Sequence, residues 1–214
     1  MGLLIYLRHS FSAIITKNQK GFTSTMKKII AGILSLIASY GIIYYLVMPT
    51  LMHYPRLAGM MHRFVYTDEA LWAFLFLSLW LFYIQWERRQ LWSVYLYLFY
   101  SVYALLMFIV LFTKAEHYHA LNLDIRQVPL QSEAAVIEFV LNIGYFIPLG
   151  ILYGMRARLS EAVVLALVTI VGIETLQYVF YLGTFDIWDI LTNFAGCMIG
   201  YGLCSQLKKQ FRKG

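Results

Sequence analysis

Six residues of this sequence have side chains that hydrogen-bond or exchange protons, yet they lie in strongly apolar segments. They are Asn142, Glu174, Gln177, Asp186, Asp189 and Asn193. Carboxylates can serve as general acids and bases, and amide groups can donate hydrogen bonds to them. A charged group that faces lipid costs about 2.5–3.5 kcal/mol, so these side chains are expected to face a shared interior. The pattern predicts an acidic and amide-lined pocket that binds a ligand.

The spacing of the polar residues places them on common helix faces. The sets are Glu138 with Asn142, Glu174 with Gln177, and Asp186 with Asp189 and Asn193. Members of each set are three or four residues apart, and residues at that spacing lie on one face of an α-helix. We therefore expect three helices to present these faces to one another.

Composition indicates what kind of protein carries these helices. The chain has 214 residues, of which 61% are hydrophobic and 13% are charged, and its mean hydropathy is +0.67. Soluble domains carry about 25% charged residues, so this chain is expected to be an integral membrane protein. The net charge of +6 is better explained by orientation in a membrane than by nucleic acid, which is not an expected partner.

Six apolar runs have a length close to the ~20 residues that cross a bilayer as a helix. They are 29–48, 70–86, 91–112, 136–154, 162–181 and 186–204. The predicted fold class is an all-α polytopic transmembrane helical bundle with six spans. The lipid bilayer is its first expected partner.

The basic residues predict the orientation of this bundle. Of the 17 Lys and Arg residues, 13 fall on the side of the chain ends and 4 on the other side. Cytoplasmic loops are enriched in Lys and Arg, so both termini are expected in the cytoplasm. With the ~1.5 Å rise per residue of a helix, the polar residues then lie roughly 5–10 Å below the outer surface.

The chain divides into four predicted parts. They are an amphipathic and basic N-terminal extension (1–28), the first three spans (29–112), a three-helix core (136–204) and a basic cytoplasmic tail (205–214). Met26 precedes two lysines and an apolar run, as an initiator methionine would, so residues 1–25 are expected to be an upstream extension. The tail is expected to lie on anionic lipid.

Two pairs of glycines four residues apart predict how the core helices pack. Gly150 and Gly154 end the fourth span, and Gly196 and Gly200 lie in the inner half of the sixth. Small residues at this spacing allow helix backbones to approach closely. We expect these spans to touch at the cytoplasmic side and to separate outward, helped by a kink at Pro148.

Three segments of the core resemble the VanZ-like family of membrane proteins. They read NIGYFIPLGILYG (142–154), IETLQ (173–177) and DIWDILTNFAGCMIGYG (186–202). Many members carry an arginine just before the first aspartate of the last segment, where this chain has Gly183-Thr184-Phe185. The resemblance implies a small multi-pass protein of the bacterial plasma membrane. It also implies a link to the cell envelope and to low-level teicoplanin resistance, with the six polar residues as motif positions.

Several functions fit these residues. The leading prediction is a pocket that binds a lipid-linked cell-wall precursor or a glycopeptide antibiotic. An intramembrane enzyme that uses Glu174 and Asp189, and a proton-coupled transporter, are alternatives. The simplest interpretation of the amide side chains is that they form a hydrogen-bond network that only joins the helices. The sequence shows no Ser-His-Asp grouping and no phosphate-binding motif, and it predicts neither a cofactor nor a metal.

Overall fold

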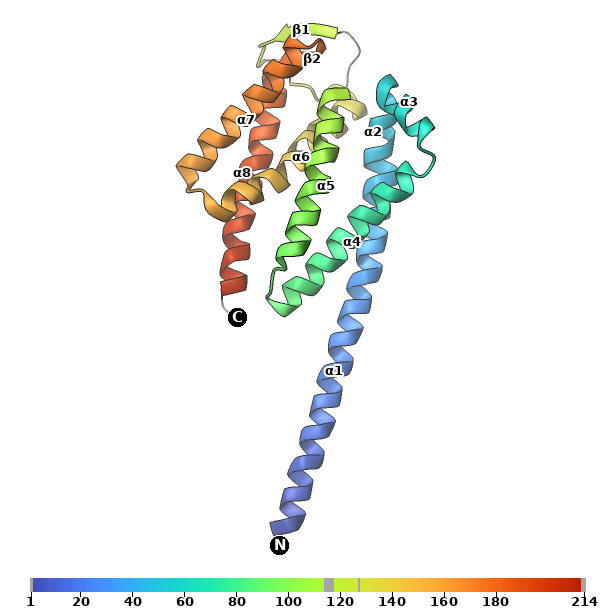
Figure 1. Ribbon diagram of the computed structural model, residues 1–214, viewed down its shortest axis with the longest axis vertical. Coiled ribbons are helices and arrows are strands. Elements are labelled where there is room, and N and C mark those ends of the chain that lie inside the picture. Colours follow the sequence, from blue (N-terminus) through green and yellow to red (C-terminus); the bar gives the residue numbers. More distant parts are fainter. Residues whose placement is uncertain (1, 114–117, 127, 213–214) are drawn as a thin grey trace.

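A computed structural model describes residues 2–113, 118–126 and 128–212 of the chain, and nearly all of them are helical (Figure 1). The helices are α1 (Gly2–Gly41), η1 (Ile42–Val47), α2 (Met48–His53), α3 (Pro55–Arg63), α4 (Thr67–Arg88), α5 (Ser93–Thr113), α6 (Glu133–Arg156), α7 (Leu159–Val179) and α8 (Ile187–Arg212). Two short strands lie in the connections between helices: β1 (Tyr118–Asn122) between α5 and α6, and β2 (Leu182–Asp186) between α7 and α8.

The long helices form a bundle with the strands at one end (Figure 1). The C-terminal end of α8 and the loop between α4 and α5 lie at the opposite end, and α1 extends well beyond the bundle on that side (Figure 1). Helix α1 is continuous through position 28, so no break in the helix separates the predicted N-terminal extension from the first predicted span.

Five described segments are long and apolar enough to cross a membrane. They are Gly21–Met52, Thr67–Arg88, Ser93–Phe112, Glu133–Arg156 and Leu159–Val179. The chain is therefore a helical membrane bundle, as its composition predicts. Helix α8 is also long, but Asp189 and Asn193 near its start reduce its hydropathy. Six spans and cytoplasmic termini remain predictions.

The loop expected after the first span is partly helical. The α-helical register gives way to the π-helix η1 just before Pro49, which has no N–H to donate to the preceding turn. Helix α3 then begins at Pro55. Its buried residues Leu57 and Met61 are four apart and pack with Leu51 in a small apolar cluster. This amphipathic spacing explains why the segment folds back as a helix.

Helices α6 and α8 make the most extensive contact in the bundle, as their glycines predict. A Cβ atom on Gly150 would overlap the backbone of Cys197, and one on Gly196 would overlap the carbonyl of Ile143. The two backbones are thus in direct contact along the inner part of the pair. Only glycine permits this approach, because any other residue would force the helices apart.

Helix α7 completes the three-helix core through a single buried face. Its buried residues are Ala162, Ala166, Ile170, Ile173, Glu174 and Gln177. Each of them lies three or four positions from another member of the set, which is the spacing of residues on one helix face. The opposite face exposes Val164 and Val168, as expected for a helix that contacts lipid.

Strands β1 and β2 form a parallel pair in which Tyr118 lies opposite Leu182 and Asn122 opposite Asp186. The predicted fifth span, 162–181, extends two residues past the end of the helix at Val179. Tyr181 has a positive φ of 58°, and this left-handed residue turns the chain into β2. The strand pair was not foreseen, because each strand has only five residues.

Candidate functional site

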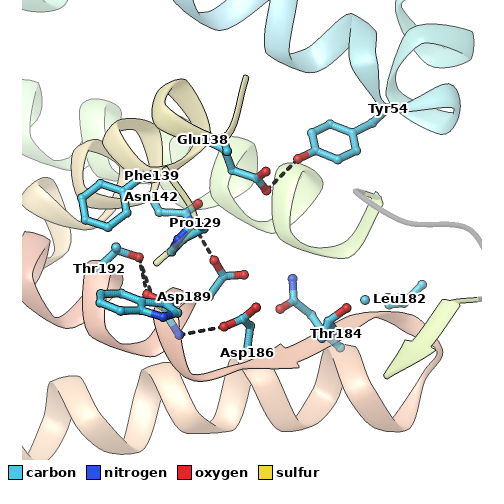
Figure 2. A pocket seen from close by; sticks show the side chains of 14 residues that line it. Tyr54, Pro129, Glu138, Phe139, Asn142, Leu182, Thr184, Asp186, Asp189 and Thr192 are labelled. Atoms are coloured by element: carbon cyan, nitrogen blue, oxygen red, sulfur yellow. Dashed lines mark hydrogen bonds between the residues drawn. The ribbon is translucent and has the colours of Figure 1, made fainter. Parts of the chain in front are cut away.

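A pocket of about 320 Å³ lies where α6, β2 and α8 meet (Figure 2). We call it the acidic pocket. Its described lining is Tyr54, Pro129, Ala135, Glu138, Phe139, Asn142, Gln177, Leu182, Gly183, Thr184, Asp186, Trp188, Asp189 and Thr192. Three of these residues carry carboxylates, and none of the described lining residues is Lys, Arg or His.

Asp189 and Asn142 bridge α8 and α6 at the floor of the acidic pocket. Asn142 Nδ2 donates a hydrogen bond to Asp189 Oδ1 at 2.7 Å (Figure 2). Phe139 and Trp188 also line the pocket, with their ring centroids 6.4 Å apart. Side chains therefore also link the two helices at the end nearer the strand pair, beyond the region where the glycines bring the backbones together.

Asp186 lies at the junction of β2 and α8. Its Oδ1 accepts a hydrogen bond from the backbone N–H of Trp188 at 2.8 Å, as a helix-capping residue does. Its Oδ2 accepts a bond from Asn122 Nδ2 at 2.9 Å, which ties β1 to the site. The expectation that Asp186 shares a helix face with Asp189 was wrong, since the helix begins at Ile187.

Glu138 adds a third carboxylate from α6, and its partner comes from the N-terminal half of the chain. Tyr54 Oη donates a hydrogen bond to Glu138 Oε1 at 2.8 Å (Figure 2). Tyr54 follows α2 and precedes α3. The site is thus not confined to the last three helices, and the turn between α2 and α3 forms part of its wall.

Glu174 and Asn193 lie deeper, in a small void that we call the inner chamber. Its volume is about 30 Å³, and Asn142, Gln177 and Asp189 line both the chamber and the acidic pocket. Glu174 is 1% exposed and Asn193 is 3% exposed. Asn193 Oδ1 has no hydrogen-bond partner among the described residues. A polar void of this size can hold one water molecule.

Gln177 connects the site to α5. Its Nε2 donates a hydrogen bond to the backbone carbonyl of Leu111 at 2.6 Å. One glutamine side chain therefore joins α7 to α5 while it lines the acidic pocket. The structure brings all six residues singled out from the sequence to this region: Asp186 lines only the acidic pocket, Glu174 and Asn193 line only the inner chamber, and the other three line both.

Sequence reasoning did not include Glu138, Tyr54, Asn122 and Thr184 among the site residues. The spacing of Glu138 to Asn142 was a usable signal, because it put both residues on one helix face. The other three residues gave no signal, since they are ordinary polar residues in short connecting segments. Their contribution depends on the turn before α3 and on the pairing of β1 with β2.

The lining of the acidic pocket favours a particular ligand chemistry. Carboxylate, amide and hydroxyl groups hydrogen-bond ammonium groups and sugar hydroxyls, whereas a phosphate would be repelled by the carboxylates. Across the part of the chain that the structure describes, no group of three or more His, Cys, Asp and Glu side chains is placed to hold a metal ion.

These features define a class of protein, namely a helical membrane protein with an acidic pocket between its core helices. A sequence model of the VanZ/LLP1 family matches residues 74–208, well over half of the chain, and the chain belongs to that family. The match includes most of α4 and all of α5 as well as the three-helix core. No curated protein and no solved structure gives a match to the chain.

Proposed function

We propose that the acidic pocket opens to the outside of a bacterial plasma membrane and binds a cationic or hydroxyl-rich group of a cell-envelope compound. Two compounds have suitable groups: a lipid-linked wall precursor, through its peptide amine and sugars, and the glycopeptide teicoplanin, through the same kinds of group. Binding either one would change how the glycopeptide reaches its target in the cell wall.

The observation that carries the proposal is the gathering of three carboxylates in the lining of one pocket. Glu138, Asp186 and Asp189 come from three separate segments, so the fold holds them together at an electrostatic cost. A purely structural network would join helices at lower cost with amides, because an amide carries no charge to desolvate. A cationic ligand would offset the repulsion between the carboxylates.

The surrounding hydrogen bonds support a preformed site. Tyr54, Asn122 and Asn142 each donate to one carboxylate of the pocket. These three donor groups fix the orientation of the carboxylates before a ligand binds, and this lowers the conformational entropy lost on binding. A carboxylate can accept about four hydrogen bonds, so Asp186 can also accept a bond from a ligand.

The test combines antibiotic susceptibility with direct binding. Expression of the chain in a teicoplanin-sensitive Gram-positive host is expected to raise the inhibitory concentration of teicoplanin. In titration calorimetry, purified protein is expected to bind teicoplanin or a lipid-linked muropeptide. Glu138→Gln and Asp186→Asn should each weaken that binding about 10- to 100-fold, as for loss of one charge-assisted hydrogen bond.

Glu133→Gln is the matched control, because Glu133 is exposed on the same helix and does not line the pocket. It should bind as the unaltered protein does. If neither compound binds and susceptibility does not change, or if the control weakens binding as much as the pocket variants, the proposal is wrong.

An enzymatic role is the second candidate, because Asp189 lines the acidic pocket and Glu174 lines the adjoining inner chamber. In this scheme Asp189 would contact the substrate and Glu174 would exchange a proton through the chamber. Incubation of the purified protein with a lipid-linked muropeptide distinguishes the roles. A new product that Glu174→Gln abolishes would establish catalysis, and binding without product would exclude it for that compound.

A further inference from the structure

A second, larger cavity lies at the other end of the bundle, between α4, α5, α6 and α8. It has a volume of about 720 Å³, more than twice that of the acidic pocket, and it shares no lining residue with it. Its described lining is Leu75, Ser78, Leu79, Phe82, Leu91, Tyr95, Leu96, Phe99, Tyr100, Pro148, Ile151, Met155, Cys204, Leu207, Lys208 and Phe211. We call it the apolar cavity.

The hydroxyl groups in the wall of the apolar cavity already have partners within the protein. Tyr95 Oη donates to the carbonyl of Ser78 at 2.9 Å, and Tyr100 Oη donates to the carbonyl of Pro148 at 3.0 Å. Ser78 Oγ donates to the carbonyl of Phe74 at 2.7 Å. Away from Lys208, the cavity therefore presents methyl, methylene and aromatic groups to whatever fills it, and a polar group would gain few hydrogen bonds there.

The dimensions of the apolar cavity suit one leaflet of a bilayer. Its lining runs from Leu91, just before α5, to Tyr100 on that helix, and along α8 from Cys204 to Phe211. With a rise of 1.5 Å per residue, these stretches are roughly 10–13 Å long. Half of the ~30 Å hydrocarbon core of a bilayer is only slightly longer. The cavity can thus hold the acyl chain of a lipid from that leaflet.

Charge selects the lipid class. Lys208 is the only charged residue in the described lining, and it lies in the last part of α8, where its side chain is exposed. A lysine near a helix end reaches toward the headgroups, where it attracts anionic lipid. Arg88 and Arg89 end α4 at the same side, and Trp86 of α4 contacts Phe211 with ring centroids 5.8 Å apart.

We propose that the apolar cavity is a binding site for one anionic phospholipid, with an acyl chain between α4, α5 and α8 and its phosphate beside Lys208. The lipid would fill the space that separates α4 and α5 from the three-helix core at this end. It would thereby act as a structural ligand of the bundle, independently of any compound in the acidic pocket.

Native mass spectrometry of the full-length protein with phosphatidylglycerol or phosphatidylcholine tests this site. We expect one retained lipid per chain, with phosphatidylglycerol preferred about fivefold, as for one added ionic contact. Lys208→Gln should remove the preference, and Lys209→Gln, its neighbour outside the cavity, should not. Leu79→Trp and Leu96→Trp, which fill the cavity, should each displace both lipids, whereas Leu77→Trp on the exposed face of α4 should retain them.

The outcome is decided by the contrast between each variant and its control. Retention of lipid in both cavity-filling variants would overturn the proposal, as would equal lipid preference in Lys208→Gln and Lys209→Gln. If the unaltered protein is a dimer that Leu79→Trp converts to a monomer without loss of lipid, a second copy fills the cavity and the proposal is also wrong. Two filling variants on different helices ensure that misfolding of one does not prevent the test.

Discussion

Replacement of Gly200 by alanine is expected to destabilise the protein through the contact between α6 and α8. A Cβ atom at this position would overlap the carbonyl oxygen of Ile147 and lie 2.9 Å from the backbone nitrogen of Ile151 and 3.0 Å from the Cα of Gly150. All three atoms belong to the backbone of the facing helix, so no side chain can rotate away. Overpacking of this kind costs about 1–3 kcal/mol.

Gly202 provides the matched control, because a Cβ atom there meets nothing within 4 Å and the residue lies on the same helix. Both substitutions gain the same ~0.5–1 kcal/mol of helix propensity, so that contribution cancels in the comparison. Gly200→Ala should therefore be about 1–3 kcal/mol less stable than Gly202→Ala. Reversible unfolding in mild detergent, followed by circular dichroism, measures the difference. Equal stability of the two variants would refute the close helix contact.

Substitutions at three further positions test side-chain hydrogen bonds by the same unfolding measurement. Tyr103→Phe removes the hydroxyl that donates to the carbonyl of Tyr145 on α6 at 2.6 Å and should lower the free energy of unfolding by about 0.5–1.5 kcal/mol. An unchanged free energy of unfolding would contradict that hydrogen bond. Asp186→Ala removes the cap on the N–H of Trp188 and the acceptor for Asn122; loss of the cap alone should cost about 0.5–2 kcal/mol, whereas Asp186→Asn should retain most of the stability. Asn142→Leu removes the donor to Asp189 and should cost about 1.5–3 kcal/mol; a gain in stability would argue against the bridge.

Sequence alone could predict the helical bundle and the pairing of α6 with α8. Length and hydropathy define the long helices, since only helices satisfy the backbone within a bilayer. The pair Gly150 and Gly154 and the pair Gly196 and Gly200 predicted which helices touch, and the overlaps of their Cβ positions confirm it. The hydropathy of the long segments and the spacing of the glycines are both local features of the sequence, so they can be recognised without knowledge of the tertiary structure.

The details of the site could not be predicted in the same way. The inward faces of α6, α7 and α8 predicted that Asn142 and Asp189 approach each other, and their 2.7 Å hydrogen bond agrees. The role of Tyr54 depends on a turn far away in the sequence, and that of Asn122 depends on pairing between two five-residue strands. Such contacts arise from tertiary packing and leave no periodic pattern in the sequence.

Accessibility of Thr184 to a membrane-impermeant thiol reagent tests the central claim, that an acidic pocket opens to the outside of the cell. Thr184 lines the pocket, and Cys197 and Cys204 are both buried, so an introduced Thr184→Cys supplies the reactive thiol. The account predicts that a maleimide added to intact cells labels this thiol, and that Gln206→Cys, exposed near the C-terminal end of α8, reacts only after the membrane is permeabilised. Labelling of Gln206→Cys but not Thr184→Cys in intact cells would contradict it.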